Sequence, residues 1–181
     1  MAEVTQSPGT VVDDATVGTV AWLNPGNILT SNNGYATVDS EFGNPTSNYL
    51  KATNFGFVIP AGATINGILV EIESKVSGST NTWSNVRIVK GGSISTTTKS
   101  GATNGITTTE GYSSIPASGA ETDLWGETWT ADDINSSTFG VVASLSIPVF
   151  TQVSVDHIRI TVYYTEATTY NSPFPSHRRI T

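Results

Sequence analysis

Residues 154–165, SVDHIRITVYYT, restrict the possible folds of this chain more than any other stretch. Apolar and polar side chains alternate here without a break. One face would take Ile158, Ile160, Val162 and Tyr164, and the other would take His157, Arg159, Thr161 and Tyr163. Period-two alternation of mostly β-branched residues, without Pro or Gly, is typical of a long, half-buried strand inside a sheet.

A second stretch, residues 65–76, alternates in the same way. Its apolar face is predicted to hold Ile68, Val70, Ile72 and Val76, and its polar face Glu71, Glu73 and Lys75. We expect these two strands to form the centre of the fold. In that arrangement Ile158, Ile160 and Val162 face Ile68, Val70 and Ile72, either across a sandwich or along one sheet.

Shorter strands separated by turn signals account for most of the remaining chain. They are predicted at 18–23, 35–38, 49–59, 82–90 and 139–147, with a weaker edge strand at 93–100. Residues 102–122 are mainly Thr, Ser, Gly and Ala, and we expect a long surface excursion there. The only helix signal lies at 129–136, where Thr130 and Asp133 resemble a capping box.

This pattern predicts an all-β fold. Roughly eight strands with almost no helix fit a two-sheet antiparallel β-sandwich, jelly-roll-like, with one very short helix. A sandwich of immunoglobulin type is the alternative, although the chain has no Cys and so cannot contain the usual Cys–Trp–Cys pattern. We expect the sandwich to span residues 17–166, between extended N- and C-terminal arms at 1–16 and 167–181.

The C-terminal arm has a composition of its own. It combines two prolines with aromatic and basic side chains, in a chain with 8 Lys and Arg against 15 Asp and Glu. Aromatic rings can fill apolar pockets and arginines can pair with carboxylates on a neighbouring subunit. We therefore predict that this arm docks on a partner through Tyr170, Phe174, Arg178 and Arg179.

Charge and composition exclude several classes of function. The net charge is −7, which leaves no basic face for sequence-independent nucleic-acid binding. No apolar stretch approaches membrane-spanning length, so no membrane partner is expected. The absence of Cys excludes disulfides and Cys-based zinc sites. The N-terminus has neither the basic nor the apolar region of a secretory signal peptide.

Tryptophan offers the first candidate site. Trp83, Trp125 and Trp129 could form an aromatic platform for the apolar face of a pyranose. Trp is also large and usually mostly buried, so these side chains could instead pack in the core and hold the 102–122 excursion in place. We favour packing.

Metal binding and catalysis have weaker signals. Asp132, Asp133 and Asn135 could offer oxygen ligands to calcium, but their spacing does not match an EF-hand, and helix capping explains the acids. Strand alternation would send Ser154 and Asp156 to the face opposite His157, which prevents a local catalytic triad. Glu71 and Glu73 share one face, and we interpret them as a solvated pair. We expect no metal, no cofactor and no enzymatic activity.

Four segments resemble a known group of proteins. They are GTVAWLNPGNI at 18–28, YLKATNFGFVIPAGATINGILVEIE at 49–73, DLWGETWTADDINSSTFGVV at 123–142 and VDHIRITVYYT at 155–165. Together they resemble small β-sandwich proteins encoded among the structural genes of tailed bacteriophages. The resemblance implies a non-enzymatic virion component, made in the host cytoplasm and exposed on the particle. It supplies no catalytic residues.

Two functions follow as hypotheses. The first is a capsid decoration or cement protein that docks through its arms, with a tail or fibre component as the nearest variant. Its partners would be phage capsid or tail proteins, and we expect a homo-oligomer. The alternative is a carbohydrate-binding module or adhesin that uses exposed Trp and Tyr side chains. Binding to emptied capsids would support the first, and binding of glycans by the isolated protein would support the second.

Overall fold

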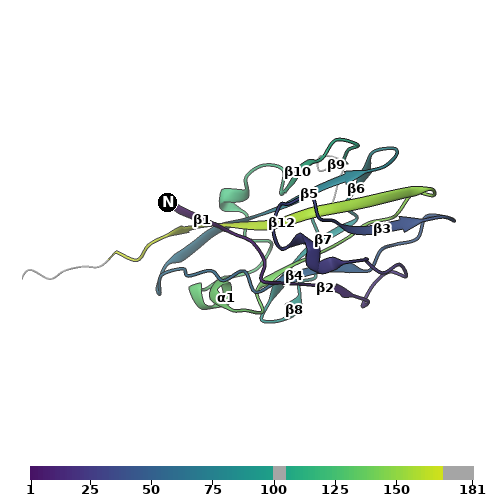
Figure 1. Ribbon diagram of the computed structural model, residues 1–181. Helices are drawn as coiled ribbons and strands as arrows, with labels where there is room; N and C mark the ends of the chain where they lie inside the picture. The colour runs from purple at the N-terminus through teal and green to yellow at the C-terminus, as the bar shows by residue number, and fades with distance from the viewer. Residues whose placement is uncertain (100–104, 169–181) are drawn as a thin grey trace, which may run out of the picture.

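The computed structural model describes residues 1–99 and 105–168. Two five-stranded sheets pack face to face, and every pairing between named strands is antiparallel (Figure 1). The predicted two-sheet antiparallel sandwich is confirmed. Within the described ranges, no helix is long and apolar enough to cross a membrane.

The two sheets have these strands. Sheet A has the order β1 (Ala2–Gln6), β12 (Thr151–Thr165), β5 (Thr64–Val76) and β10 (Gly111–Ile115), with β3 (Ala36–Ser40) also paired to β12. Sheet B has the order β2 (Thr10–Asp14), β4 (Tyr49–Thr53), β11 (Gly140–Ser144), β7 (Asn85–Lys90) and β8 (Ser93–Ile94). A small ribbon joins β6 (Asn81–Thr82) to β9 (Gly105–Ile106). The helical segments are η1 (Pro25–Leu29), η3 (Ala120–Thr122) and α1 (Ala131–Asn135).

Strands β5 and β12 form the centre of sheet A, as the alternation predicted. Their register places Ile158 opposite Ile72, Ile160 opposite Val70, and Val162 opposite Ile68. All six side chains have an exposed fraction of 0%. The two apolar stripes therefore lie side by side along one sheet and together face sheet B. Burying each such side chain contributes about 1.5–3 kcal/mol to stability.

A β-bulge corrects the prediction for Asp156. The register between β12 and β5 shifts between Val155 and His157, so Asp156 is an extra residue without a partner across the ladder. Its carboxylate lies within 4.8 Å of carboxylate oxygens from Glu73 and Glu110 on the outer face of sheet A. Asp156 thus reaches the same face as His157, because a bulge breaks the strict alternation of sides.

Residues 1–16 do not form an arm, contrary to the prediction. Strand β1 pairs with β12 in sheet A, and β2 pairs with β4 in sheet B. The Asp13 carboxylate accepts hydrogen bonds from the Trp22 backbone N–H (2.8 Å) and from Asn48 Nδ2 (2.8 Å). The edge position explains the weak apolar pattern, because ladder hydrogen bonds come from the backbone of any residue.

Residues 102–122 also differ from the prediction of a surface excursion. Residues 111–115 form β10, which pairs with β5 and completes sheet A. Ile106 and Ile115 are each only 1% exposed. Polar residues suit this strand because β10 lies at the end of the sheet order, with one face toward solvent.

Smaller differences concern two predicted strands. Residues 18–23 make only isolated bridges, from Val20 to Ser47 and from Leu23 to Thr37. Strand β4 ends at Thr53, because Asn54 follows with a positive φ of 59°. The capping box of α1 is confirmed: Thr130 Oγ1 accepts from the Asp133 N–H (3.1 Å), and Asp133 Oδ2 accepts from the Thr130 N–H (2.9 Å).

Candidate functional site

Three of the four Trp side chains are buried in the core. Trp22, Trp83 and Trp125 are 3%, 1% and 0% exposed, and Trp22 stacks on Trp83 with ring centroids 6.4 Å apart. The Trp125 indole Nε1 donates to the backbone oxygen of Ile68 at 2.9 Å. Trp83 and Trp125 therefore act as packing residues and cannot form a glycan platform.

Trp129 is the exception, because its half-buried ring lines an open hollow. The hollow has a volume of about 370 Å³ and lies between the turn at residues 61–64 and residues 129–132. Trp129 is held from behind by Phe139, which meets it edge-on at 5.4 Å between ring centroids. Its indole Nε1 donates to the Leu124 backbone oxygen at 2.9 Å, which sets the orientation of the ring. We call this feature the Trp129 hollow.

The rest of the Trp129 hollow is small or polar. Ala61, Gly62 and Ala63 contribute little bulk on one side. The Asp132 side chain is exposed on the other side, and its carboxylate accepts no hydrogen bond from any residue that the structure describes. An aromatic ring beside an available carboxylate is suited to a ligand with one apolar face and peripheral hydroxyl groups.

Lys90 and Asp133 lie at the edge of this region. Lys90 Nζ is 5.2 Å from the centroid of the Trp129 ring and 3.5 Å from Asp133 Oδ2. Burial would raise the pKa of Asp133, but hydrogen bonds from Thr130 and the charge of Lys90 outweigh it and hold that pKa below its usual value. Asn135 binds the backbone N–H and oxygen of Ile59. The side chains of Asp133 and Asn135 thus make hydrogen bonds within the protein, and they do not form a calcium site with Asp132.

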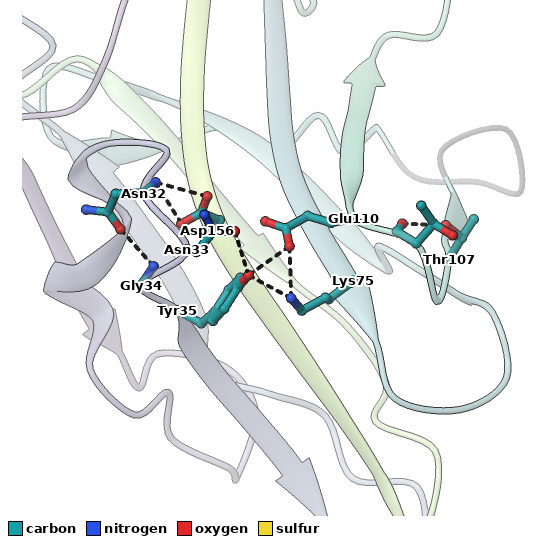
Figure 2. A network of polar contacts seen from close by, with 9 residues as sticks. Asn32, Asn33, Gly34, Tyr35, Lys75, Thr107, Glu110 and Asp156 are labelled. Atoms are coloured by element: carbon teal, nitrogen blue, oxygen red, sulfur yellow. Dashed lines mark hydrogen bonds and ion pairs between the residues drawn. The ribbon is translucent and has the colours of Figure 1, made fainter.

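The outer face of sheet A carries a second group of polar side chains (Figure 2). Lys75 Nζ donates to Glu110 Oε2 (2.9 Å) and to the Tyr35 hydroxyl (2.7 Å), and lies 4.0 Å from the Tyr35 ring centroid. The Tyr35 hydroxyl donates to Glu110 Oε2 at 2.8 Å. The hydrogen bonds to Tyr35 and Glu110 raise the pKa of Lys75. Figure 2 shows the three side chains converging from three separate segments.

Three carboxylates meet beside this group. Glu73, Glu110 and Asp156 each place an oxygen within 4.8 Å of the others. Asp156 accepts hydrogen bonds from the Asn32 backbone N–H at 3.2 and 3.1 Å, whereas Glu73 Oε2 is buried with no hydrogen-bond partner in the described chain. The Lys75 ammonium already brings a positive charge to Glu110, so the cluster alone does not indicate a bound metal ion.

Farther along sheet A, Arg159 holds a bidentate ion pair with Glu71. Arg159 Nε and Nη2 donate to the two Glu71 oxygens at 2.7 and 3.1 Å, and the guanidinium carbon lies 4.1 Å from the Tyr112 ring centroid. Glu71 and Glu73 are therefore not the solvated pair that the sequence predicted. The ion pair holds Glu71, and the Glu73 Oε2 atom is buried.

His157 links Tyr112 to Ser7. Its Nδ1 lies 2.9 Å from the Tyr112 hydroxyl, and its Nε2 lies 3.0 Å from Ser7 Oγ. Burial lowers the pKa of His157. Burial also raises the pKa of Tyr112 to about 12, and the nearby Glu73 carboxylate contributes to that rise. A neutral phenol does not provide the negative charge that stabilises an imidazolium in a catalytic triad. Sequence reasoning missed this contact because 150 residues separate Ser7 from His157.

One end of the sandwich exposes large apolar side chains. Phe42 and Phe150 are 81% and 80% exposed, and Val149 is 42% exposed. We call this group the apolar tip. The residues predicted to dock on a partner, Tyr170, Phe174, Arg178 and Arg179, lie outside the described residues.

Acid titration tests the Glu110 ion pair. Burial would raise the pKa of Glu110, but hydrogen bonds from Lys75 and Tyr35 hold it below its usual value. A lowered folded-state pKa stabilises the protein above the unfolded pKa of about 4.3, and this contribution is lost as pH falls through the folded pKa. Glu110→Gln should lower stability at pH 7 by up to about 1 kcal/mol, since the pair is partly exposed.

The measurement is the melting temperature from pH 7 to pH 3. Glu110→Gln should show a smaller decrease than the wild type on acidification, because it has already lost this contribution. Glu166→Gln, at an exposed position on the C-terminal side of β12, is the matched control and should follow the wild-type curve. Identical acid profiles for all three proteins would contradict the assigned ion pair.

Comparisons with known proteins identify no family for this chain. No protein-family model matches this chain, and no curated protein matches it. Among solved structures, the chain is similar to the CBM22-1 xylan-binding domain from Paenibacillus barcinonensis Xyn10C, with 8% sequence identity and a TM-score of 0.38. The match covers 88% of this chain and 92% of that domain. At this level the likeness carries no argument about ligand or site, and the resemblance to phage proteins stays a hypothesis.

Proposed function

We propose that this chain is a carbohydrate-binding β-sandwich that holds its ligand in the Trp129 hollow. One observation carries the proposal. Of the four Trp side chains, three are buried, and Trp129 faces an open hollow together with an exposed carboxylate. The glycan platform, which the sequence offered as the alternative to packing, is thereby reduced from three Trp residues to one.

The chemistry of the hollow suits a sugar ring. The C–H face of a pyranose is apolar and can stack on the indole, while its hydroxyl groups donate hydrogen bonds to the Asp132 carboxylate. The small side chains of the 61–64 turn leave space for the ring. Phe139 and the Leu124 oxygen hold the Trp129 ring in place, which lowers the entropy lost on binding.

Glycan-array screening followed by titration calorimetry tests this function. A bound glycan should lose about tenfold or more in affinity with Asp132→Ala, because a hydrogen bond to a charged group is worth about 1.5–3 kcal/mol. Trp129→Ala should abolish binding. Melting curves accompany both variants, since Trp129 also packs on Phe139.

Two control variants remove matching groups elsewhere on the surface. Phe42→Ala removes an exposed aromatic ring, and Asp39→Ala removes an exposed acid. Both should bind the glycan as the wild type does. The proposal fails if no glycan binds, or if Trp129→Ala and Asp132→Ala retain wild-type affinity.

A structural protein of a phage particle is the second candidate, and the apolar tip favours it. Exposed Phe side chains that gather at one end suit protein–protein contact better than solvent. Co-sedimentation with emptied capsids or tails tests this candidate. Phe42→Ser should release the protein from the particle, whereas Asp132→Ala should not. Attachment unaffected by Phe42→Ser would argue against the tip as the contact.

A further inference from the structure

The apolar tip is built on two loops that are tied to each other. Phe42 follows β3, and Phe150 precedes β12. The Phe150 backbone N–H donates to the Ser40 backbone oxygen at 2.7 Å, and the Ser40 hydroxyl donates to the Phe42 backbone oxygen at 3.0 Å. These bonds keep the two rings at the same end of the molecule, although both remain about four-fifths exposed at 81% and 80%.

The backbone at Phe150 is strained in the conformation that exposes the ring. Its φ is 54°, in the left-handed region that bulky residues rarely adopt. Because the Phe150 ring is 80% exposed, it makes few packing contacts that could offset the free-energy cost of this backbone strain. Strained residues of this kind concentrate at binding sites, where a partner supplies the missing contacts.

Two acidic side chains lie beside the tip. Asp39 and Glu41 are exposed and, with Phe150, line a hollow of about 210 Å³. This surface complements a segment that offers both an aromatic ring and positive charge. Residues 169–181 of this chain contain Tyr170 and Phe174 followed by Arg178 and Arg179, in a protein whose net charge is −7.

We propose that the apolar tip of one molecule binds residues 169–181 of a second copy of this chain. In this contact an aromatic side chain, Phe174 or Tyr170, enters the hollow beside Phe150. Arg178 and Arg179 pair with Asp39 and Glu41. The contact is independent of the Trp129 hollow, so it adds to the proposed glycan binding.

The length of the chain requires a contact between copies. The tip lies at the Thr151 end of β12, and the described chain leaves the sandwich at the opposite end, after Thr165 (Figure 1). Fourteen residue steps along a strand span about 45–48 Å. From residue 168, Arg179 can reach at most about 40 Å and Phe174 about 22 Å, even if the chain is fully extended. Phe174 therefore cannot reach the hollow of its own molecule, so the aromatic contact requires a second copy.

Sedimentation velocity of the chain comprising residues 1–181, over a wide range of concentrations, tests the contact. The wild type should associate with increasing concentration. The double variant Arg178→Glu/Arg179→Glu should weaken association about tenfold or more, because it places negative charges against Asp39 and Glu41. The double variant Asp39→Arg/Glu41→Arg should have the same effect, because it places positive charges against Arg178 and Arg179. All four substitutions combined should restore association, since the charge pairs are then reversed.

A mixing experiment identifies which ends meet. Phe42→Ser with Phe150→Asn removes the tip, and Asn is compatible with the positive φ at position 150. At a concentration where the wild type associates, this tip variant and the Arg178→Glu/Arg179→Glu variant should each remain mostly monomeric when alone. Their mixture should form a complex, because one supplies an intact C-terminal segment and the other an intact tip.

Several results would overturn the proposal. The proposal is wrong if the wild type stays monomeric at all concentrations, or if the arginine substitutions leave its association unchanged. It is also wrong if the charge reversal does not restore association, or if the mixture of variants forms no complex. Binding of the Phe42 and Phe150 rings to lipid vesicles, with no self-association, would assign the tip to a membrane surface instead.

Discussion

Ile160→Asp is expected to leave no folded protein at 25 °C. Ile160 is 0% exposed and lies opposite Val70 at the centre of sheet A, with neighbouring apolar side chains on both strands. The substitution removes an apolar group worth about 1.5–3 kcal/mol and places an unpaired carboxylate in the core, at a further cost of several kcal/mol. The total approaches or exceeds the usual 5–15 kcal/mol stability of a domain.

Circular dichroism and urea unfolding measure this result. Ile160→Val is the matched control, because it keeps an apolar β-branched side chain and should cost about 0.5–1.5 kcal/mol. Gln152→Ser, at an exposed position on the same strand, should melt close to the wild type. A soluble Ile160→Asp variant with wild-type melting temperature would show that the register of β12 is wrong.

Trp125→Ala should lower the free energy of unfolding by about 3–5 kcal/mol, as for other buried aromatic side chains. Trp125 also completes the hydrogen bonding of a sheet edge. Strand β10 ends at Ile115, opposite Val70, and farther along β5 Ile68 bonds instead to the Asp123 backbone oxygen and the Trp125 indole. The alanine variant therefore leaves a cavity and also removes the hydrogen bond to a buried carbonyl.

Two further variants separate these effects. Trp125→Phe retains an aromatic ring but cannot donate to Ile68, so its cost combines a lost hydrogen bond of about 1–3 kcal/mol with a cavity smaller than that of Trp125→Ala. Trp129→Ala should cost less than Trp125→Ala, because Trp129 is only half-buried. Urea unfolding of all three variants tests the order. Equal destabilisation by Trp125→Ala and Trp129→Ala would contradict the different burial of the two rings.

Local patterns in the sequence were sufficient for the central part of the fold. Alternation in residues 65–76 and 154–165 predicted two long strands and their buried faces, and the structure decided that the two apolar stripes lie along one sheet. The capping box of Thr130 and Asp133 predicted the short helix α1. These features are visible in sequence because burying one face, or capping one turn, demands particular residue types at a fixed spacing.

The Trp129 hollow could be predicted only in part. The sequence drew attention to Trp83, Trp125 and Trp129 but offered no means of ranking their exposure. The burial of Trp125 and the partial exposure of Trp129 depend on how the segment from η3 to α1 packs against β5, whereas Trp83 is buried in contact with Trp22. The Ala61–Ala63 side of the hollow lies far from Trp129 in sequence, so only the fold brings the two together.

Other features were decided by tertiary structure alone. Residues 2–6 and 10–14 became edge strands, and the bulge at Asp156 brought its carboxylate to Glu73 and Glu110. The physical reason is that ladder hydrogen bonds are made by backbone groups, which every residue except proline carries in full. Edge pairing and bulges therefore leave almost no trace in side-chain pattern, whereas a buried apolar face is specified residue by residue.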